Sequence, residues 1–274
     1  MPDEPKPDKQ EEEIQARTSP PGQIVYHAIH REGEHELERD SGALAWSGLA
    51  AGLSMGFSMV AQALLKIHLP DTRWQPLITK LGYTIGFLIV ILGRQQLFTE
   101  NTLTPILVLL KKKKFRVLGN VVRLWAIVLV TNLAGTFAFA WIAAHSSIFD
   151  PNAKLAFSEI AREAINLSFT TTLLRAVVAG WLIAMMVWLL PFAEVARVGV
   201  IIILSYLVGL GHFSHIVAGG TEVFYLVATS EISFAHSLKI FFLPTLIGNV
   251  IGGVSLVAAL AHAQFMAAGR GEHS

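Results

Sequence analysis

The sequence predicts an all-α integral membrane protein of six transmembrane helices, in which the second and the fifth are broken by polar stretches. Three observations support this fold class. Hydrophobic residues make up 53% of the 274 residues and charged residues only 15%, against roughly 25% charged residues in soluble globular domains. The sequence has six apolar segments whose lengths are near or above the ~20 residues that a helix needs to cross a bilayer core. Polar stretches over residues 97–103 and 211–220 interrupt two of them.

The first 40 residues are expected to lie outside the membrane. Residues 1–22 combine six acidic and three basic residues with several prolines, a composition that buries too little apolar surface to fold. We therefore expect a disordered cytoplasmic tail there. Over residues 23–40, charges surround a few apolar positions, which is typical of an amphipathic helix on the cytoplasmic surface. Residues 266–274 are expected to form a second cytoplasmic tail.

The six segments follow in order between residues 41 and 265, the predicted transmembrane pore domain. The first carries Gly48, Gly52 and Gly56 at four-residue spacing, which predicts close approach by another helix. In chain order the segments cover about residues 43–67, 77–93 continued by 103–110, 117–144, 167–190, 198–210 continued by 223–228, and 241–263.

The two halves of the chain share a pattern. Segment three contains Asn132-Leu-Ala-Gly135 and segment six contains Asn249-Val-Ile-Gly252, at matching places in two apolar helices. Segments two and five both break. Because each half has three crossings, an odd number, a duplication would place the second copy in the opposite orientation. The sequence thus predicts two inverted three-helix repeats.

The distribution of basic residues predicts the orientation. Lys111 to Lys114 and Arg116 lie between segments two and three, and Arg197 lies between segments four and five. Lysine and arginine gather in cytoplasmic loops, so both termini are expected in the cytoplasm. With a net charge of only +1, nothing favours nucleic acid as a partner, and we expect the lipid bilayer to surround the chain.

Non-helical backbone at membrane depth is tolerated only where protein buries it or where it lines a watery cavity. The two breaks therefore predict a pore, and helices that restart after each break would turn positive dipole ends toward the midplane and favour anions. His215 in the second break could donate to an anion, or it could be a neutral histidine that a nearby hydroxyl satisfies. Arg175, inside segment four, either attracts anions or belongs to a structural ion pair.

At these residues the chain resembles the formate/nitrite transporter family, over about residues 24–265. Residues 97–101, Leu-Phe-Thr-x-Asn, are similar to the family's Leu-Phe-Thr loop in its second helix. Residues 213–218, Phe-Ser-His-Ile-Val-Ala, are similar to its Phe-Glu-His-Ser-x-Ala loop in the fifth. Residues 244–253 are similar to its sixth-helix pattern Pro-x-x-x-Gly-Asn-x-x-Gly-Gly. Three motifs in the right order make this resemblance specific.

Carried over position by position, the resemblance assigns the pore residues. It places the central pore histidine at His215 and the threonine near it at Thr99. It places one constriction at Leu97 and Phe98, whose alternative role is core packing. It places the second constriction at Val208, the residue before the histidine at Ser214 and the basic residue of the fourth helix at Arg175. Ser214 stands where the family has an acid, Gln96 also replaces an acid, and Gly180 and Gly219 replace asparagines.

The resemblance implies a homopentamer in a bacterial inner membrane, in which each protomer encloses its own aquaporin-like pore. It implies transport of small monovalent weak-acid anions, with His215 sharing a proton with the anion. We expect no cofactor and no metal site. Two alternatives stay open, a pore for a small neutral solute and a non-transporting scaffold or sensor. We do not expect an enzyme, because Ser214 and His215 are adjacent and cannot easily pair as nucleophile and base.

Overall fold

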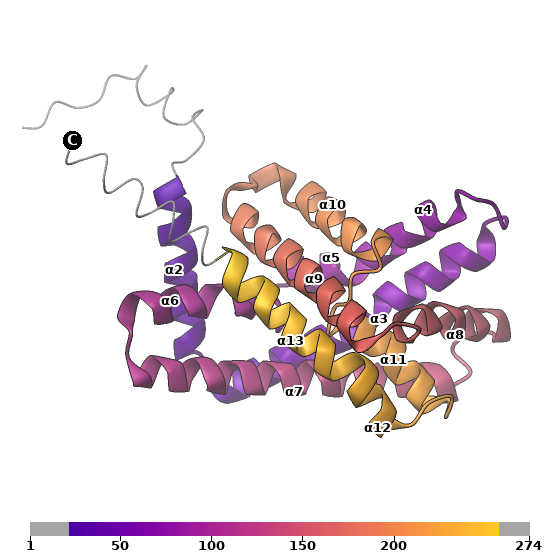
Figure 1. Cartoon of the computed structure of the whole chain (residues 1–274). Helices are drawn as coiled ribbons and strands as arrows, with labels where there is room; N and C mark the ends of the chain where they lie inside the picture. Colours follow the sequence, from indigo (N-terminus) through magenta and orange to yellow (C-terminus); the bar gives the residue numbers. More distant parts are fainter. Residues whose placement is uncertain (1–21, 258–274) are drawn as a thin grey trace, which may run out of the picture.

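The computed structural model describes residues 22–257, without the side chains at positions 23, 194, 256 and 257. All regular structure in that range is helical (Figure 1). The predicted tails lie outside the described residues, apart from residue 22, and so do residues 258–265 of the predicted pore domain. A helix, α2 (Gly22–Glu38), covers most of residues 23–40, where an amphipathic helix was expected, and it stands beside α6 (Figure 1).

The first half of the described chain forms a long helix, an interrupted arm and a second long helix. The elements after α2 are α3 (Ser41–His68), α4 (Gln75–Thr79), the 3-10 turn η1 (Lys80–Tyr83), α5 (Thr84–Leu92), the 3-10 turn η2 (Glu100–Thr102), α6 (Thr104–Lys112) and α7 (Phe115–His145). Asp40 begins α3, since its carboxylate accepts from the backbone N–H groups of the first turn.

The second half repeats this order after a surface helix. Its elements are α8 (Pro151–Ile165), α9 (Phe169–Leu189), the turns η3 (Leu190–Phe192) and η4 (Glu194–Ala196), α10 (Arg197–Leu210), α11 (Ala218–Ala228), α12 (Phe234–Ser237), η5 (Leu238–Phe242), α13 (Leu243–Ile251) and η6 (Gly252–Val257). Helix α8, which begins at the Asp150 cap, was not expected; its charged residues exclude it from the apolar segments.

Five helices of the described chain are long and apolar enough to cross a membrane. They are Ser41–His68, Gln75–Leu92, Phe115–His145, Phe169–Phe192 and Phe234–Ser255. The fifth expected segment instead begins as the short apolar helix Arg197–Leu210. Its chain then leaves the helical state and resumes in α11, so the fifth segment consists of two short helices with a break between them, as the polar stretch predicted.

The breaks differ in extent from the sequence prediction. In the first, α5 already ends at Leu92, and the chain from residue 93 to Thr99 is not helical. In the second, α11 begins at Ala218, so the prediction that the break reaches Gly220 is wrong. Gly219 lies inside α11 because its missing side chain leaves room for the ring of Phe241, with which a Cβ would overlap.

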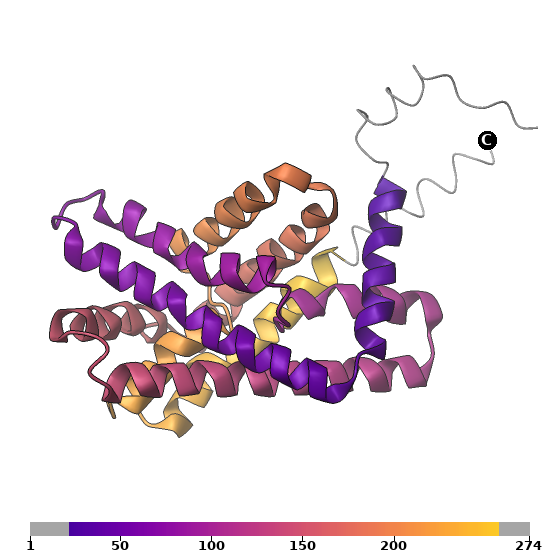
Figure 2. The ribbon, with the colours of Figure 1, turned by 180° about the vertical axis from the view of Figure 1, so that it is seen from behind.

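Glycines let the long helices of each half pack closely. Gly48, Gly52 and Gly56 all face α7, and a Cβ at Gly52 would overlap the backbone carbonyl of Asn132. In the second half Gly180 of α9 meets the backbone of Asn249 in α13 in the same way. The close approach predicted from the glycine spacing is thus confirmed. The two views show α3 along α7 and α9 along α13 (Figures 1 and 2).

Candidate pore site

The backbone of the first break is held by one asparagine side chain. The Asn132 Oδ1 accepts from the backbone N–H of Phe98 at 2.9 Å. Its Nδ2 donates to the backbone carbonyls of Gln96 at 2.8 Å and of Gly48 at 2.7 Å. Asn132 is fully buried. Non-helical backbone inside a membrane protein needs such partners, because no lipid group can replace them.

The second break is held by Asn249 in the same way. Its Oδ1 accepts from the backbone N–H of Ile216 at 2.9 Å, and its Nδ2 donates to the carbonyls of Ser214 at 2.9 Å and of Ala176 at 2.8 Å. In both breaks, the asparagine from the last long helix of that half bonds two residues that are two positions apart. It also bonds a carbonyl of the first long helix.

Both breaks also begin with the same helix ending. The residues that follow Gly93 and Gly211 are left-handed, with φ of 49° at Arg94 and 50° at His212. The backbone N–H of each left-handed residue donates to the carbonyl three positions before it, and the N–H of the next residue donates to the carbonyl five positions before that residue. This is the Schellman pattern of a helix C-terminus. The two breaks are therefore ordered structures that start with the same helix C-terminal motif at corresponding places.

The structure brings His215 of the second break against Thr99 of the first. The His215 Nε2 and Thr99 Oγ1 are 2.8 Å apart, and the exposed fractions of the two residues are 1% and 0%. The His215 Nδ1 accepts the backbone N–H of Ala218 at 3.1 Å, so the proton of the neutral imidazole is assigned to Nε2. Nε2 then donates to the threonine, whose own hydroxyl proton stays available for a solute.

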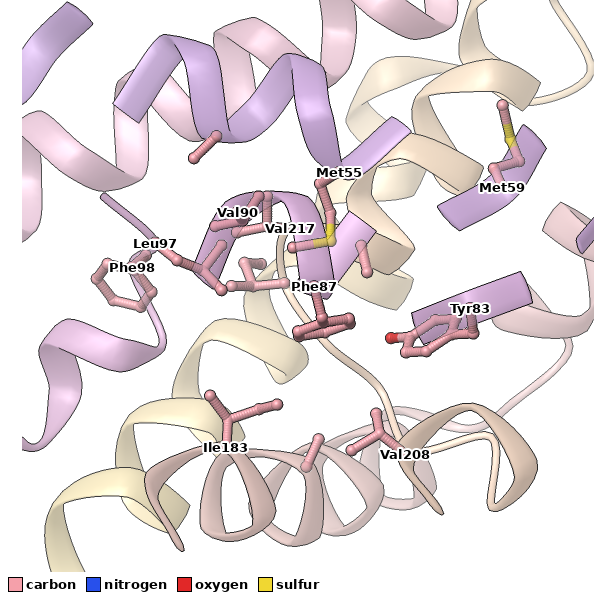
Figure 3. Packing of buried hydrophobic residues seen from close by; sticks show 14 of the residues in the cluster. Met55, Met59, Tyr83, Phe87, Val90, Leu97, Phe98, Ile183, Val208 and Val217 are labelled. Carbon is pink, nitrogen blue, oxygen red and sulfur yellow. The ribbon is translucent and has the colours of Figure 1, made fainter. Parts of the chain in front are cut away.

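Apolar side chains pack around this pair. The ring of Phe87 meets the His215 imidazole edge to face, with centroids 5.1 Å apart. Leu97 lies with Val90 and Val217, and Phe98 lies at the edge of this group (Figure 3), where its ring meets that of Trp125. Leu97 and Phe98 are 0% and 2% exposed, so a continuous apolar layer lies beside the histidine.

A cavity of about 40 Å³ opens beside His215, enough for at least one water molecule. Of the predicted pore residues, Val208, Ser214 and His215 line it. Thr99, Leu97 and Phe98 lie outside its lining. Arg175 is also outside, half-buried, with a guanidinium Nη1 3.5 Å from the backbone carbonyl of His212. The lining also includes polar and titratable groups from five parts of the chain: Gln62, Lys80, Tyr83, Glu163, His212 and Glu222.

Sequence reasoning missed most of this polar wall. The Lys80 Nζ donates to Gln62 Oε1 at 3.2 Å and to Glu163 Oε2 at 3.0 Å, and Gln62 Nε2 donates to Glu222 Oε1 at 3.2 Å. Lys80, Gln62 and Glu222 are buried. The signal was a lysine inside an otherwise apolar segment, which by default marks a functional position.

Comparison with known proteins agrees with this geometry. The sequence profile of the formate/nitrite transporter family, described as "Formate/nitrite transporter", matches residues 23–263. The inner membrane protein YfdC of Escherichia coli (strain K12) is 41% identical over 240 residues, 88% of this chain and 77% of that protein. The formate channel BtFdhC of Bacillus thuringiensis is 28% identical over 248 residues, 86% of this chain and 92% of that protein.

Two solved structures share the fold. A structure described as a pentameric formate channel with formate bound aligns with a TM-score of 0.67 at 18% identity, over 82% of this chain and 98% of that one. An ion channel of the same family aligns with a TM-score of 0.75 at 17% identity, over 88% and 99% of the two chains. With a family profile over nearly the whole described chain and a relative at 41% identity, the chain belongs to the formate/nitrite transporter family.

Proposed function

We propose that this protein conducts small monovalent weak-acid anions of the formate and nitrite kind across a bacterial inner membrane. The observation that carries the proposal is the buried pair of His215 and Thr99 between the two breaks, at the end of a polar cavity. Family membership and the formate channels among its relatives support the same class of cargo.

We propose further that the protomer consists of two inverted three-helix repeats around an aquaporin-like pore. The matched hydrogen bonds of Asn132 and Asn249 support this, as do the matched helix endings at Arg94 and His212. We place both termini in the cytoplasm on the basic residues after α6. The pentameric structural neighbour supports a homopentamer, and we propose one pore in each protomer.

In this mechanism, the anion enters the cavity and loses most of its water there. A bare charge in an apolar constriction costs several kcal/mol or more. At the boundary the Thr99 hydroxyl donates to the solute. The His215 Nε2–H, which donates to Thr99 when no solute is present, turns to the solute and shares its proton with it in a hydrogen bond. Leu97 and Phe98 form the apolar constriction on the far side of the histidine, and the solute crosses it as the neutral acid.

The test is flux into liposomes that contain the purified full-length protein. Formate, nitrite, acetate, lactate and hydrosulfide are compared with glycerol, which represents a neutral cargo. We expect the wild type to carry at least one weak acid well above protein-free liposomes. His215→Asn removes the imidazole and should lower that flux at least ~10-fold, because a hydrogen bond to a charged group contributes about 1.5–3 kcal/mol and ~1.4 kcal/mol corresponds to tenfold.

The matched control is His236→Asn, the same change at an exposed histidine outside the cavity lining, which should leave flux unchanged within about twofold of wild type. Absence of flux for every weak acid in the wild type would refute the transport proposal. Flux that survives His215→Asn at the wild-type rate would instead refute the role of the histidine.

A further inference from the structure

We propose that Glu222 is a proton-binding site of the cavity and supplies the proton with which the anion crosses as a neutral acid. This inference rests on the proposed transport function and adds the source of the proton. Glu222 lies one turn into α11, 8% exposed, and lines the same cavity as His215.

The Glu222 carboxyl has one oxygen fixed and one available. Its Oε1 accepts the Gln62 Nε2–H at 3.2 Å. Within residues 22–257, no hydrogen bond reaches Oε2. Gln62 comes from α3, so the hydrogen bond fixes a carboxyl of one half of the chain against the other. A fixed carboxyl with a free oxygen at a cavity wall can hold a proton and pass it to a solute.

Charged and titratable groups from three other parts of the chain line the same cavity as this carboxyl. Lys80 and Tyr83 belong to η1, Glu163 belongs to α8, and His212 and His215 belong to the second break. The Lys80 ammonium contacts Gln62 and Glu163, and the His212 Nδ1 lies 3.3 Å from Glu163 Oε2. Lys80 thus neutralises the carboxylate of Glu163. An ionised Glu222 would be a second negative charge in the wall, and its hydrogen-bond partner, Gln62, is neutral.

The histidine cannot itself be the net source of the proton. Its Nδ1 already accepts the backbone N–H of Ala218, so an imidazolium would place two N–H groups against each other. The neutral ring has a single proton on Nε2 and can share it only in a hydrogen bond. The proton that neutralises the anion therefore comes from a different group, and Glu222 is a carboxyl in the same cavity.

An ionised Glu222 would also oppose entry. At ~5 Å and an effective dielectric of ~20, two like charges lower the occupancy of an anion on the order of a hundredfold. Protonated Glu222 removes that repulsion. The anion then takes the proton: the O–H bond on Glu222 breaks, an O–H bond on the solute forms, and the bonding electron pair stays on the carboxylate. A hydronium ion from the aqueous phase at the cavity mouth then protonates Glu222 again and becomes water, and no oxidant or reductant takes part.

The experiment measures formate flux into liposomes between pH 5.5 and pH 8 with the full-length protein. Glu222→Gln keeps an acceptor for Gln62 but holds no transferable proton, and we expect at least ~10-fold less flux over the whole range. Glu222→Asp keeps the carboxyl and should restore a flux that falls as pH rises. Glu159→Gln, at a carboxylate of α8 that pairs with Lys66 outside the cavity lining, should follow the wild-type profile.

Folding is checked by the apparent melting temperature of each variant in detergent. If Glu222→Gln melts like wild type and conducts formate at the wild-type rate, Glu222 is not the proton source and the inference fails. It also fails if Glu222→Gln is fully active and merely loses its pH dependence, since the carboxyl would then act only by repulsion. Loss of flux in His215→Asn alongside an active Glu222→Gln would overturn this inference and leave the transport proposal intact.

Discussion

The asparagine side chains that hold the two breaks allow a direct test of the scaffold. Asn249→Ala removes three hydrogen bonds that join α13 to α9 and to the second break. The Ala176 carbonyl belongs to helix α9, but the Ser214 carbonyl and the Ile216 N–H have no other partner within the described residues. Each buried group left without a partner costs about 1–3 kcal/mol, so we expect a loss of about 2–6 kcal/mol in the free energy of unfolding.

Asn132→Ala should cost a similar amount, because the same three kinds of bond are lost in the first break. The matched control is Asn120→Ala, the same change near the start of α7 at a side chain with no hydrogen bond in the described chain. Heating each variant in mild detergent and measuring the folded fraction gives apparent melting temperatures. At about 2–4 °C per kcal/mol for chains of this size, each pore variant should melt on the order of 10 °C lower.

Two results would refute this reasoning. If Asn249→Ala had the same apparent melting temperature as Asn120→Ala, the fold of the second break would not depend on its asparagine. If only one of the two pore asparagines mattered, the two breaks would not be equivalent structures. Because Asn132 and Asn249 lie in different halves, the comparison also tests the proposed repeat.

Two further predictions concern close packing and pH. Gly180→Ala would place a Cβ against the Asn249 backbone and should destabilise the fold by about 3 kcal/mol, as overpacking does; Gly119→Ala, with nothing near its Cβ, should be neutral by the same melting assay. The pKa of His30 in α2 lies below its ordinary 6.5, mainly because the side chain is buried and next because Lys111 is nearby. When α2 is packed against α6, it therefore favours the neutral ring. Its contribution to docking is present above pH 6.5 and is lost as pH falls below that value. Hydrogen exchange of α2, corrected for intrinsic rates, should therefore be faster at pH 5.5 than at pH 7.5, and His30→Leu should remove this difference; a difference that persists would exclude His30 as its cause.

Much of the candidate pore centre could be predicted from the sequence because its residues lie in short motifs. His215 and Thr99 were predicted to approach each other, and the structure places Nε2 and Oγ1 2.8 Å apart. Asn132 and Asn249 were recognised as a repeated pattern, although their role in holding the breaks was not. A motif shows which residues recur, whereas hydrogen bonds across 34 to 84 residues of chain depend on the packing of helices.

The polar wall of the cavity could not be predicted in this way. Lys80, Gln62 and Glu163 come from three different elements, and the bonds between them join residues 18 and 83 positions apart. Lys80 and Gln62 look like isolated polar residues in apolar segments, and Glu163 is one of several charged residues of α8. Helix α8 was missed for a related reason: it is too charged to be read as a membrane span, and a search for apolar runs passes over it.

The matched hydrogen bonds also indicate where the proposed function departs from the proposed repeat. The backbone carbonyls of Gln96 and Ser214 accept from the amide groups of Asn132 and Asn249, and the backbone N–H groups of Phe98 and Ile216 donate to the oxygens of the same two side chains. The residue between them is Leu97 in the first break and His215 in the second. The scaffold therefore treats the two positions alike, but only one carries a group that can share a proton. The asparagines that recur in both halves hold the fold, whereas the chemistry that we propose for the pore comes from a position at which the halves differ.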